Sequence, residues 1–173
     1  RRLDLEEPDT PRKAETPGQD FGGAVVRDLT VTADAVFLAA IDRGVLRADI
    51  GLSGDLTAFR DTAIDGFIVQ VDASDTLLAA LDSQRGLVVS RVTGAPLEES
   101  AVAPLEAPLT DVSVTGDRVA VGLGSLGAAV YDFAGDTLTE TVRVEPPCVV
   151  SAVALRADEQ ALAVGCLSGV LVY

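Results

Sequence analysis

The chain has 173 residues and a formal net charge of −14 at pH 7, which argues against a nucleic-acid groove or an anionic membrane surface as its partner. Hydrophobic residues make up 48% of the chain and charged residues 23%, so it can bury a core, and its length suggests one domain. It contains no histidine, which removes the base of serine- and cysteine-hydrolase triads and the usual ligand of zinc and haem.

The first 23 residues differ in character from the rest. They mix proline, glycine and many charges and offer almost nothing to bury, so we expect a tail or linker. From Ala24 onward, short runs of Val, Ile, Leu and Ala are bounded by Asp, Gly, Ser or Thr. This pattern is typical of many short strands joined by turns. No apolar run reaches the roughly 18 residues that a membrane-spanning helix needs.

One phrase recurs four times along this region, at residues 36–46, 77–89, 119–130 and 161–172. In each copy a small apolar run, a turn and a glycine are followed by a second apolar run. The shared glycines are 42, 41 and 42 residues apart, and they are Gly44, Gly86, Gly127 and Gly169. The position favours a turn residue with positive φ at the start of a strand.

Further strands flank each phrase. A short apolar strand precedes it, at residues 29–31, 68–71, 112–114 and 153–155, and an alternating strand follows the first three, at 56–64, 97–102 and 138–144. A unit of four antiparallel strands and about 42 residues matches one blade of an all-β propeller. We therefore predict a propeller domain over residues 24–173, with blades at about 24–64, 65–106, 107–145 and 146–173.

The composition of the strands fits this architecture. One four-stranded blade cannot cover both of its apolar faces, so neighbouring blades must stack on it. Strands flanked on both sides read as nearly continuous apolar runs, as Val119-Ala120-Val121 does. Alanines such as Ala39 and Ala79 would let blades approach closely.

The repeated phrase resembles the LVIVD-repeat family of β-propellers over roughly residues 24–173. The best matches are Gly44-Val45-Leu46-Arg47-Ala48-Asp49 and Gly86-Leu87-Val88-Val89-Ser90, and WD-type and other propeller repeats resemble it less specifically. Membership would imply a secreted or surface binding propeller without a shared active site. We accordingly expect an extracellular, periplasmic or cell-surface location, which the acidic composition also fits.

The fourth unit stops at Val172-Tyr173, inside its third strand. Three explanations are open. Leu3-Asp4-Leu5 of the tail supplies the missing strand, the sequence belongs to a propeller with more blades, or another chain completes the sheet. We favour an incomplete ring completed by other polypeptide, because an exposed apolar edge attracts partners.

Several charged residues fall where one face of a propeller would carry them. Two aspartates lie at the mouth of inner strands, and four further charges lie in second-to-third turns. Such a rim could hold Ca²⁺ or a basic loop, although aspartate is also an ordinary turn residue. The residues concerned are Asp28, Asp111, Asp42, Arg43, Asp82 and Arg85.

The two cysteines lie in the fourth unit. Cys148 opens its first strand and Cys166 closes its second, so a hairpin would place them opposite each other. A disulfide would contribute on the order of 3 kcal/mol and imply an oxidising compartment. In a slightly different register, both are small core residues. Two thiolates without histidine fall short of a metal site.

No residue set forms a catalytic constellation, so we predict a non-enzymatic binding or scaffolding propeller. It would engage a protein partner through its rim loops or its open C-terminal edge, where strand addition would bury Leu171 and Tyr173. The partner would be another polypeptide or a second copy that completes the propeller, with no nucleic acid, no membrane insertion and no cofactor.

The alternative function is a Ca²⁺-dependent hydrolase of the propeller-lactonase kind, which needs several carboxylates at the channel mouth. Only Asp28 and Asp111 occupy equivalent inner positions, with Val69 and Ser151 as their approximate counterparts in the other units. The absence of tryptophan, with only 2 Tyr and 5 Phe, makes carbohydrate recognition a weaker third class.

Overall fold

A computed structural model of the chain describes residues 3–4, 12–13, 23–93, 97–105, 107–156 and 161–173. Two short strands, β1 (Leu3–Asp4) and β2 (Arg12–Lys13), pair with each other. Leu3 and Asp4 therefore pair with β2 and not with the last sheet, so ring closure by these two residues is wrong. Leu5, the third residue of that expectation, lies outside the described residues.

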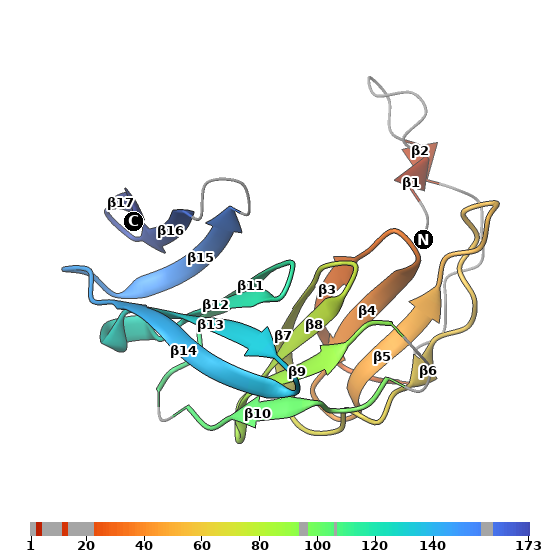
Figure 1. The fold of residues 1–173 in the computed structure, drawn as a ribbon. Coiled ribbons are helices and arrows are strands. Elements are labelled where there is room, and N and C mark those ends of the chain that lie inside the picture. Colours follow the sequence, from red (N-terminus) through yellow and green to blue (C-terminus); the bar gives the residue numbers. More distant parts are fainter. Residues whose placement is uncertain (1–2, 5–11, 14–22, 94–96, 106, 157–160) are drawn as a thin grey trace.

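Four antiparallel sheets follow one another along the chain, and in each of them consecutive strands pair (Figure 1). The first sheet contains β3 (Val26–Val31), β4 (Ala35–Ala40), β5 (Gly44–Asp49) and β6 (Arg60–Asp61). The second contains β7 (Ile68–Ala73), β8 (Leu77–Asp82), β9 (Gly86–Arg91) and β10 (Ala101–Ala103). The third contains β11 (Asp111–Thr115), β12 (Arg118–Gly122), β13 (Ala128–Ala134) and β14 (Thr137–Val144). The fourth contains only β15 (Val150–Arg156), β16 (Ala161–Cys166) and β17 (Gly169–Val172).

The predicted all-β architecture of three four-stranded sheets and one three-stranded sheet is confirmed. The outermost strands are the least regular, because they have a partner on one side only. β14 matches its expected range, but β10 has three residues and β6 only two, preceded by an isolated bridge between Ile50 and Leu56. The described helix is a single 3₁₀ turn, Gly124–Leu126, and no helix among the described residues is long and apolar enough to cross a membrane.

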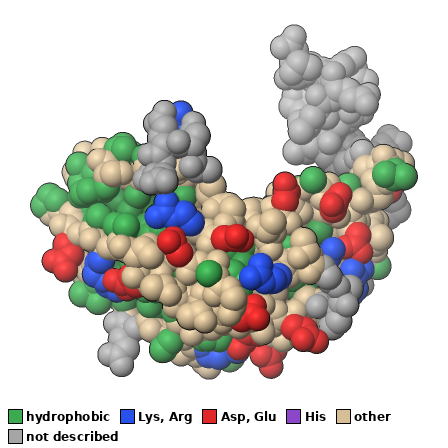
Figure 2. Space-filling model, viewed as in Figure 1, with side chains coloured by type: hydrophobic (Ala, Val, Ile, Leu, Met, Phe, Trp, Pro, Cys, Tyr) green, Lys and Arg blue, Asp and Glu red, His purple; other side chains and the backbone are tan. Residues whose placement is uncertain are grey.

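The sheets fan out from their first strands. β3 contacts β7, β7 contacts β11 and β11 contacts β15, and the other strands of each sheet lie progressively farther out (Figure 1). The arc stays open between the first and the last sheet. Figure 2 shows the same molecule as a bowl that is hollowed between its two ends.

Three of the four hydrophobic clusters lie between neighbouring sheets, and the fourth lies in the first sheet around Leu38, Ala40 and Leu46. Phe37 of the first sheet and Ile64, just after β6, pack with Val71 of the second, and Leu77 of the second packs with Val119 of the third. Ala120 of the third sheet packs with Val164 of the fourth. Successive residues of a strand point to opposite faces, so each sheet contributes one row of side chains to each neighbour.

The alanines of the repeated phrase lie in these interfaces. Ala39, Ala79, Ala80 and Ala120 are fully buried, as expected for residues that allow close approach of two sheets. Burying such runs on both faces removes roughly 25 cal/mol of unfavourable hydration per Å² of apolar surface. Stacking of the sheets is therefore the main stabilising contribution of this architecture.

The recurring glycine lies at or just before the start of the third strand of every sheet with a positive φ, which is +76° at Gly44, +104° at Gly86 and +86° at Gly127. The structure adds a second reason for glycine. A Cβ at Gly44 or Gly127 would clash with a backbone carbonyl oxygen of the segment that forms or follows the fourth strand, from Ile64 or Val144 respectively. The turn conformation was predicted, whereas the close approach of the outer segment was not visible in the sequence.

Replacement of Gly44 by alanine is expected to lower the free energy of unfolding by more than about 2 kcal/mol, because the strained φ and the backbone clash add. Gly116 is the matched control, since its φ is +56° but a Cβ there would meet nothing within 4 Å. Gly116→Ala should cost only about 1 kcal/mol. Urea denaturation measures both values, and equal losses would contradict the packing role of Gly44.

Candidate functional site

Polar side chains of the inner strands bridge neighbouring sheets along the hollow of the bowl. Asp28 Oδ2 of β3 accepts a hydrogen bond from the backbone N–H of Val71 at 3.1 Å. One sheet farther on, Asp111 Oδ2 accepts from the N–H of Val153 at 2.8 Å. Gln70 lies between the two aspartates and donates its Nε2 to Asp111 Oδ1 at 3.3 Å.

A second level of bridges lies two residues farther along the same strands. Asp72 Oδ2 accepts from the N–H of Val114 at 2.7 Å, and its Oδ1 accepts from Thr30 Oγ1 at 3.1 Å. Ser113 Oγ accepts from the N–H of Leu155 at 3.1 Å. The inner edge of each sheet would otherwise expose unpaired N–H groups, so these side chains continue the hydrogen bonding from sheet to sheet.

The predicted rim residues Asp28 and Asp111 thus hold backbone groups of the next sheet. Burial raises the pKa of Asp111 above its ordinary value, against the hydrogen bonds from Val153, Val112 and Gln70. The charge of Asp28 adds to this increase. Asp72 was missed by sequence reasoning, although it lies one repeat after Thr30, to which it is hydrogen-bonded.

The expected counterparts of Asp28 and Asp111 were wrong by one residue. Asp28 pairs with Ala39 and Gln70 pairs with Leu81, so Gln70 and not Val69 is equivalent to Asp28. The cause is a β-bulge at the start of the inner strand in the first, second and fourth sheets. By the same shift, Ala152 and not Ser151 occupies the equivalent position in the fourth sheet, so no polar group continues the series there.

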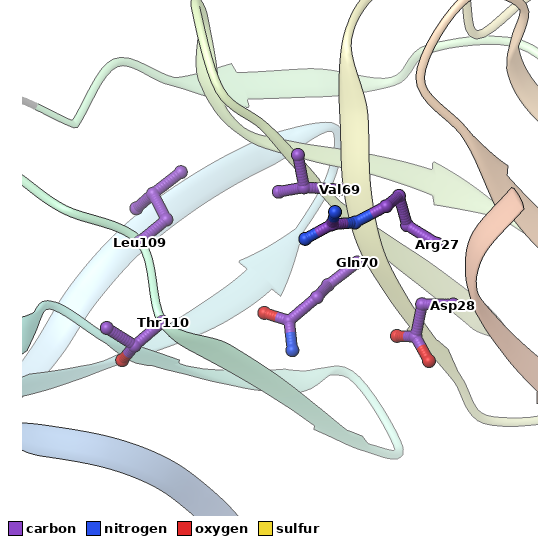
Figure 3. A pocket seen from close by; sticks show the side chains of 6 residues that line it. All are labelled: Arg27, Asp28, Val69, Gln70, Leu109 and Thr110. Atoms are coloured by element: carbon purple, nitrogen blue, oxygen red, sulfur yellow. The ribbon is translucent and has the colours of Figure 1, made fainter. Parts of the chain in front are cut away.

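The bulges open a pocket of about 280 Å³ at the mouth of the inner strands (Figure 3). The bulged residue of the first sheet, Arg27, brings a guanidinium to it, and the bulged residue of the second sheet brings only Val69. Bulges often re-aim side chains in this way. The full lining is Arg27, Asp28, Val69, Gln70, Leu109 and Thr110.

The charged turns of the first two sheets bond mainly within their own sheets. Arg43 forms an ion pair with Asp61 at 2.6 Å, and Asp42 Oδ1 accepts from the N–H of Val25 at 3.2 Å. Asp82 is 1% exposed and pairs with Arg85 at 2.8 Å. These contacts fasten the turns to adjacent strands.

Arg85 is the centre of a small network. Besides Asp82, its guanidinium donates to Glu99 Oε2 at 2.7 Å and to the backbone oxygen of Asp65 at 2.6 Å. Burial acts to raise the pKa of Asp82, but the hydrogen bonds from Arg85 and from the backbone of Gln84 outweigh it and hold this pKa below its ordinary value.

Cys148 and Cys166 form a disulfide, with their Cα atoms 6.1 Å apart. The bond joins the segment just before β15 to the end of β16, so it closes the hairpin that forms the inner part of the fourth sheet. Among the described residues, no group of three or more His, Cys, Asp or Glu side chains is arranged to hold a metal ion.

The fourth sheet differs most from the others in the exposure of its third strand. β5, β9 and β13 are buried along most of their length, whereas every residue of β17 is exposed. Leu171 is 37% exposed and Tyr173, just after the strand, is 49% exposed. The outer face of this sheet is apolar as well, with Val170 and Val172 beside Ala163 and Gly165. Figure 2 shows hydrophobic side chains gathered at this end of the molecule.

The fold has close counterparts among solved structures. The designed Ika4 protein matches with a TM-score of 0.68 and 15% identity, over 94% of this chain and 98% of its own. The β-propeller domain of Cps50 (Swd1) from Myceliophteria thermophila matches with a TM-score of 0.67 and 12% identity, over 86% of this chain and 53% of its own. The fold is a β-propeller.

A third propeller likeness concerns the designed Ika8 protein, with a TM-score of 0.66, 17% identity and coverage of 86% of this chain. The match takes in only 45% of Ika8, so the chain spans about half the length of that protein and of the Swd1 domain. No protein-family model matches the sequence, and no curated protein matches it. The likeness therefore shows the propeller fold and leaves the activity to be argued from the surfaces.

Asp82→Asn is expected to lower the free energy of unfolding at pH 7 by about 1–2 kcal/mol, since Arg85 loses its buried partner but is itself one-third exposed. The depressed pKa means that the ionised Asp82 stabilises the blade above its ordinary pKa of about 4, and that this contribution is lost as the pH falls through the lowered value. The difference between variant and wild type should therefore shrink below about pH 4. Denaturation at pH 7 and pH 3 tests this, and a constant difference would contradict it.

Proposed function

We propose that this chain is a non-enzymatic binding or scaffolding propeller of the LVIVD-repeat type, whose fourth blade takes up a strand from another polypeptide. The observation that carries the proposal is the contrast between β17 and its equivalents. In three blades the third strand is buried and paired on both sides, whereas among the described residues β17 is paired only with β16. Exposed strand edges of this kind bind extended segments by β-augmentation.

The hydrogen-bond pattern of the fourth blade defines the free groups. Tyr173 and Leu162 exchange both of their backbone hydrogen bonds, at 2.9 and 3.0 Å. In an antiparallel pair such residues alternate with others whose N–H and C=O point away. Val170 and Val172 therefore direct their backbone groups outward, to the side on which β14 lies in the third blade.

The start of β17 also has the form that an added strand requires. In the other blades the recurring glycine lies against a backbone carbonyl from the segment that forms or follows the fourth strand, and Val45 donates its N–H to such a carbonyl, that of Ile64, at 2.9 Å. Gly169 has the same place and a φ of +145°, but a Cβ there would meet nothing within 4 Å. Among the residues that the structure describes, nothing thus occupies the space of the outer strand at this blade.

The location that fits this function is extracellular, periplasmic or at the cell surface. Two observations support this aspect of the proposal, the Cys148–Cys166 disulfide and the net charge of −14. Disulfides persist in oxidising compartments, and strong net charge favours solubility.

Strand addition predicts binding of a peptide with the sequence of β14, residues 137–144, since this segment already forms the equivalent outer strand of the third blade. Titration of the labelled protein with this peptide should shift the amide resonances of Val170 and Val172. It should also slow their hydrogen exchange. Resonances that stay unchanged at saturating peptide concentrations would refute strand addition.

A proline variant makes this test specific. Val170→Pro removes an outward N–H without breaking a bond between β16 and β17, so peptide binding should weaken at least tenfold. Val170→Thr keeps the N–H and a β-branched side chain and should bind as the wild type does. Equal affinities of the two variants would contradict the edge geometry.

The alternative of a Ca²⁺-dependent hydrolase is separated by a calcium titration. Asp28 and Asp111 each accept hydrogen bonds at both carboxylate oxygens, which the backbone and Gln70 donate. We therefore expect neither heat in calorimetry nor a rise in the unfolding temperature on addition of Ca²⁺. A saturable heat that Asp28→Asn abolishes would favour the enzyme instead.

A further inference from the structure

We infer that the open face of the fourth blade binds the first blade of a second copy of this chain, head to tail, so that two copies close one propeller. This inference rests on the proposed function, in which another polypeptide completes the propeller. It adds a second copy of this chain as a partner and a second surface, the outer face of the first blade, which stacks on the fourth blade and does not itself supply the outer strand.

The open face of the fourth blade repeats a face that is already used inside the chain. In the third blade, Ala120 pairs with Val130 and Gly122 follows on the same side, and this face receives the fourth blade. In the fourth blade, Ala163 pairs with Val172 and Gly165 follows in the same way. The matching residues, in the order third blade and then fourth, are Ala120 and Ala163, Gly122 and Gly165, and Val130 and Val172.

The side chains that fill the face of the third blade indicate what the open face requires. They are Val153, Leu162 and Val164, which are at most 7% exposed. A ligand for the equivalent open face must therefore be a sheet that presents Val and Leu in the same positions.

The first blade presents such residues. In the first blade, Leu29 pairs with Leu38 and Val31 pairs with Val36. The equivalent pairs of the fourth blade are Val153 with Val164 and Leu155 with Leu162. Leu29 and Val31, on the inner strand, are 57% and 56% exposed, whereas Val153 at the equivalent place is 7% exposed. Leu38, on the next strand, is already buried at 3%. Within the described part of the chain, the inner region of this face thus still lacks a partner.

The inner strand of the fourth blade lacks the side-chain acceptors that bridge neighbouring blades elsewhere in the described chain, so an apolar contact between the fourth and first blades loses no such bridge. Ala152 and Ala154 of the fourth blade take the places that Asp28 and Thr30 occupy in the first, so they offer no side-chain acceptor to a following blade. In the first blade the N–H of Leu29 bonds instead to its own neighbour, Asp28 Oδ1, at 2.9 Å. The N–H of Leu29 is therefore already bonded within its own chain. The contact that we infer between the two copies then needs only apolar packing at this position.

Geometry and size favour two copies over an open chain of copies. The chain spans 45% and 53% of two longer propellers, so two copies approach a full ring. A face of three five-residue strands measures about 17 by 14 Å, and a single such contact buries too little for a stable complex, which needs about 1,000 Å². Head-to-tail contacts that close on themselves make two interfaces at once, and this stabilises the dimer.

The oligomeric state in solution tests the inference. Light scattering after size exclusion, and sedimentation at several concentrations, should give twice the chain mass of 17.8 kDa for the wild type. Val172→Arg in the fourth blade and Leu29→Arg in the first should each weaken dimerisation at least tenfold. Both side chains are more than half exposed, so the variants should fold, which circular dichroism checks. Leu52→Arg, in a fully exposed loop between β5 and β6, is the control and should leave the dimer intact.

Two outcomes would overturn the second-copy inference. A wild type with the mass of one chain at all concentrations would do so, and so would dimers that Val172→Arg disrupts and Leu29→Arg does not, since these would join two fourth blades. In either case, binding of the residue 137–144 peptide at β17 would still uphold strand addition. Loss of peptide binding with an intact head-to-tail dimer would refute strand addition alone.

Discussion

Every blade of this protein has two apolar faces and can cover neither of them by itself. Stacking of neighbouring blades is the constraint on which the other features depend. It explains why Ala39, Ala79 and Ala120 are small, since they lie where two sheets meet, and why three of the four hydrophobic clusters lie between sheets. It also explains why the two ends of the arc differ from the middle, because each end has one neighbour fewer.

Hydrogen bonding follows the same logic at the inner edges of the sheets. The carboxylates of Asp28, Asp72 and Asp111 accept hydrogen bonds from backbone N–H groups that a lone sheet would leave to water. These bonds fix the position of each blade along the inner strands of the next one. The acidic residues at the channel are therefore tied to construction of the fold. The fourth blade differs, because Ala152 ends the polar series there and β17 is exposed.

The sequence predicted the repeat, its length, the glycine at the start of each third strand and the three-stranded last sheet, because all of these depend on residue type at a regular spacing. It misplaced the counterparts of Asp28, since a β-bulge adds a residue without leaving a signature in the side chains. It overestimated the length of the outer strand near Arg60, because a strand that is paired on one side only is less regular. The pairing of Cys148 with Cys166 stayed open because it depends on register.

Within every sheet, each strand pairs with the strand that precedes or follows it in the chain. Contacts of this kind are local, and local contacts form quickly because little loop entropy is lost. During synthesis a completed hairpin can thus serve as the template for the next one, from the amino terminus onward. The nascent polypeptide would become ordered meander by meander, and each newly finished meander would be the least protected segment of the molecule until its successor arrives.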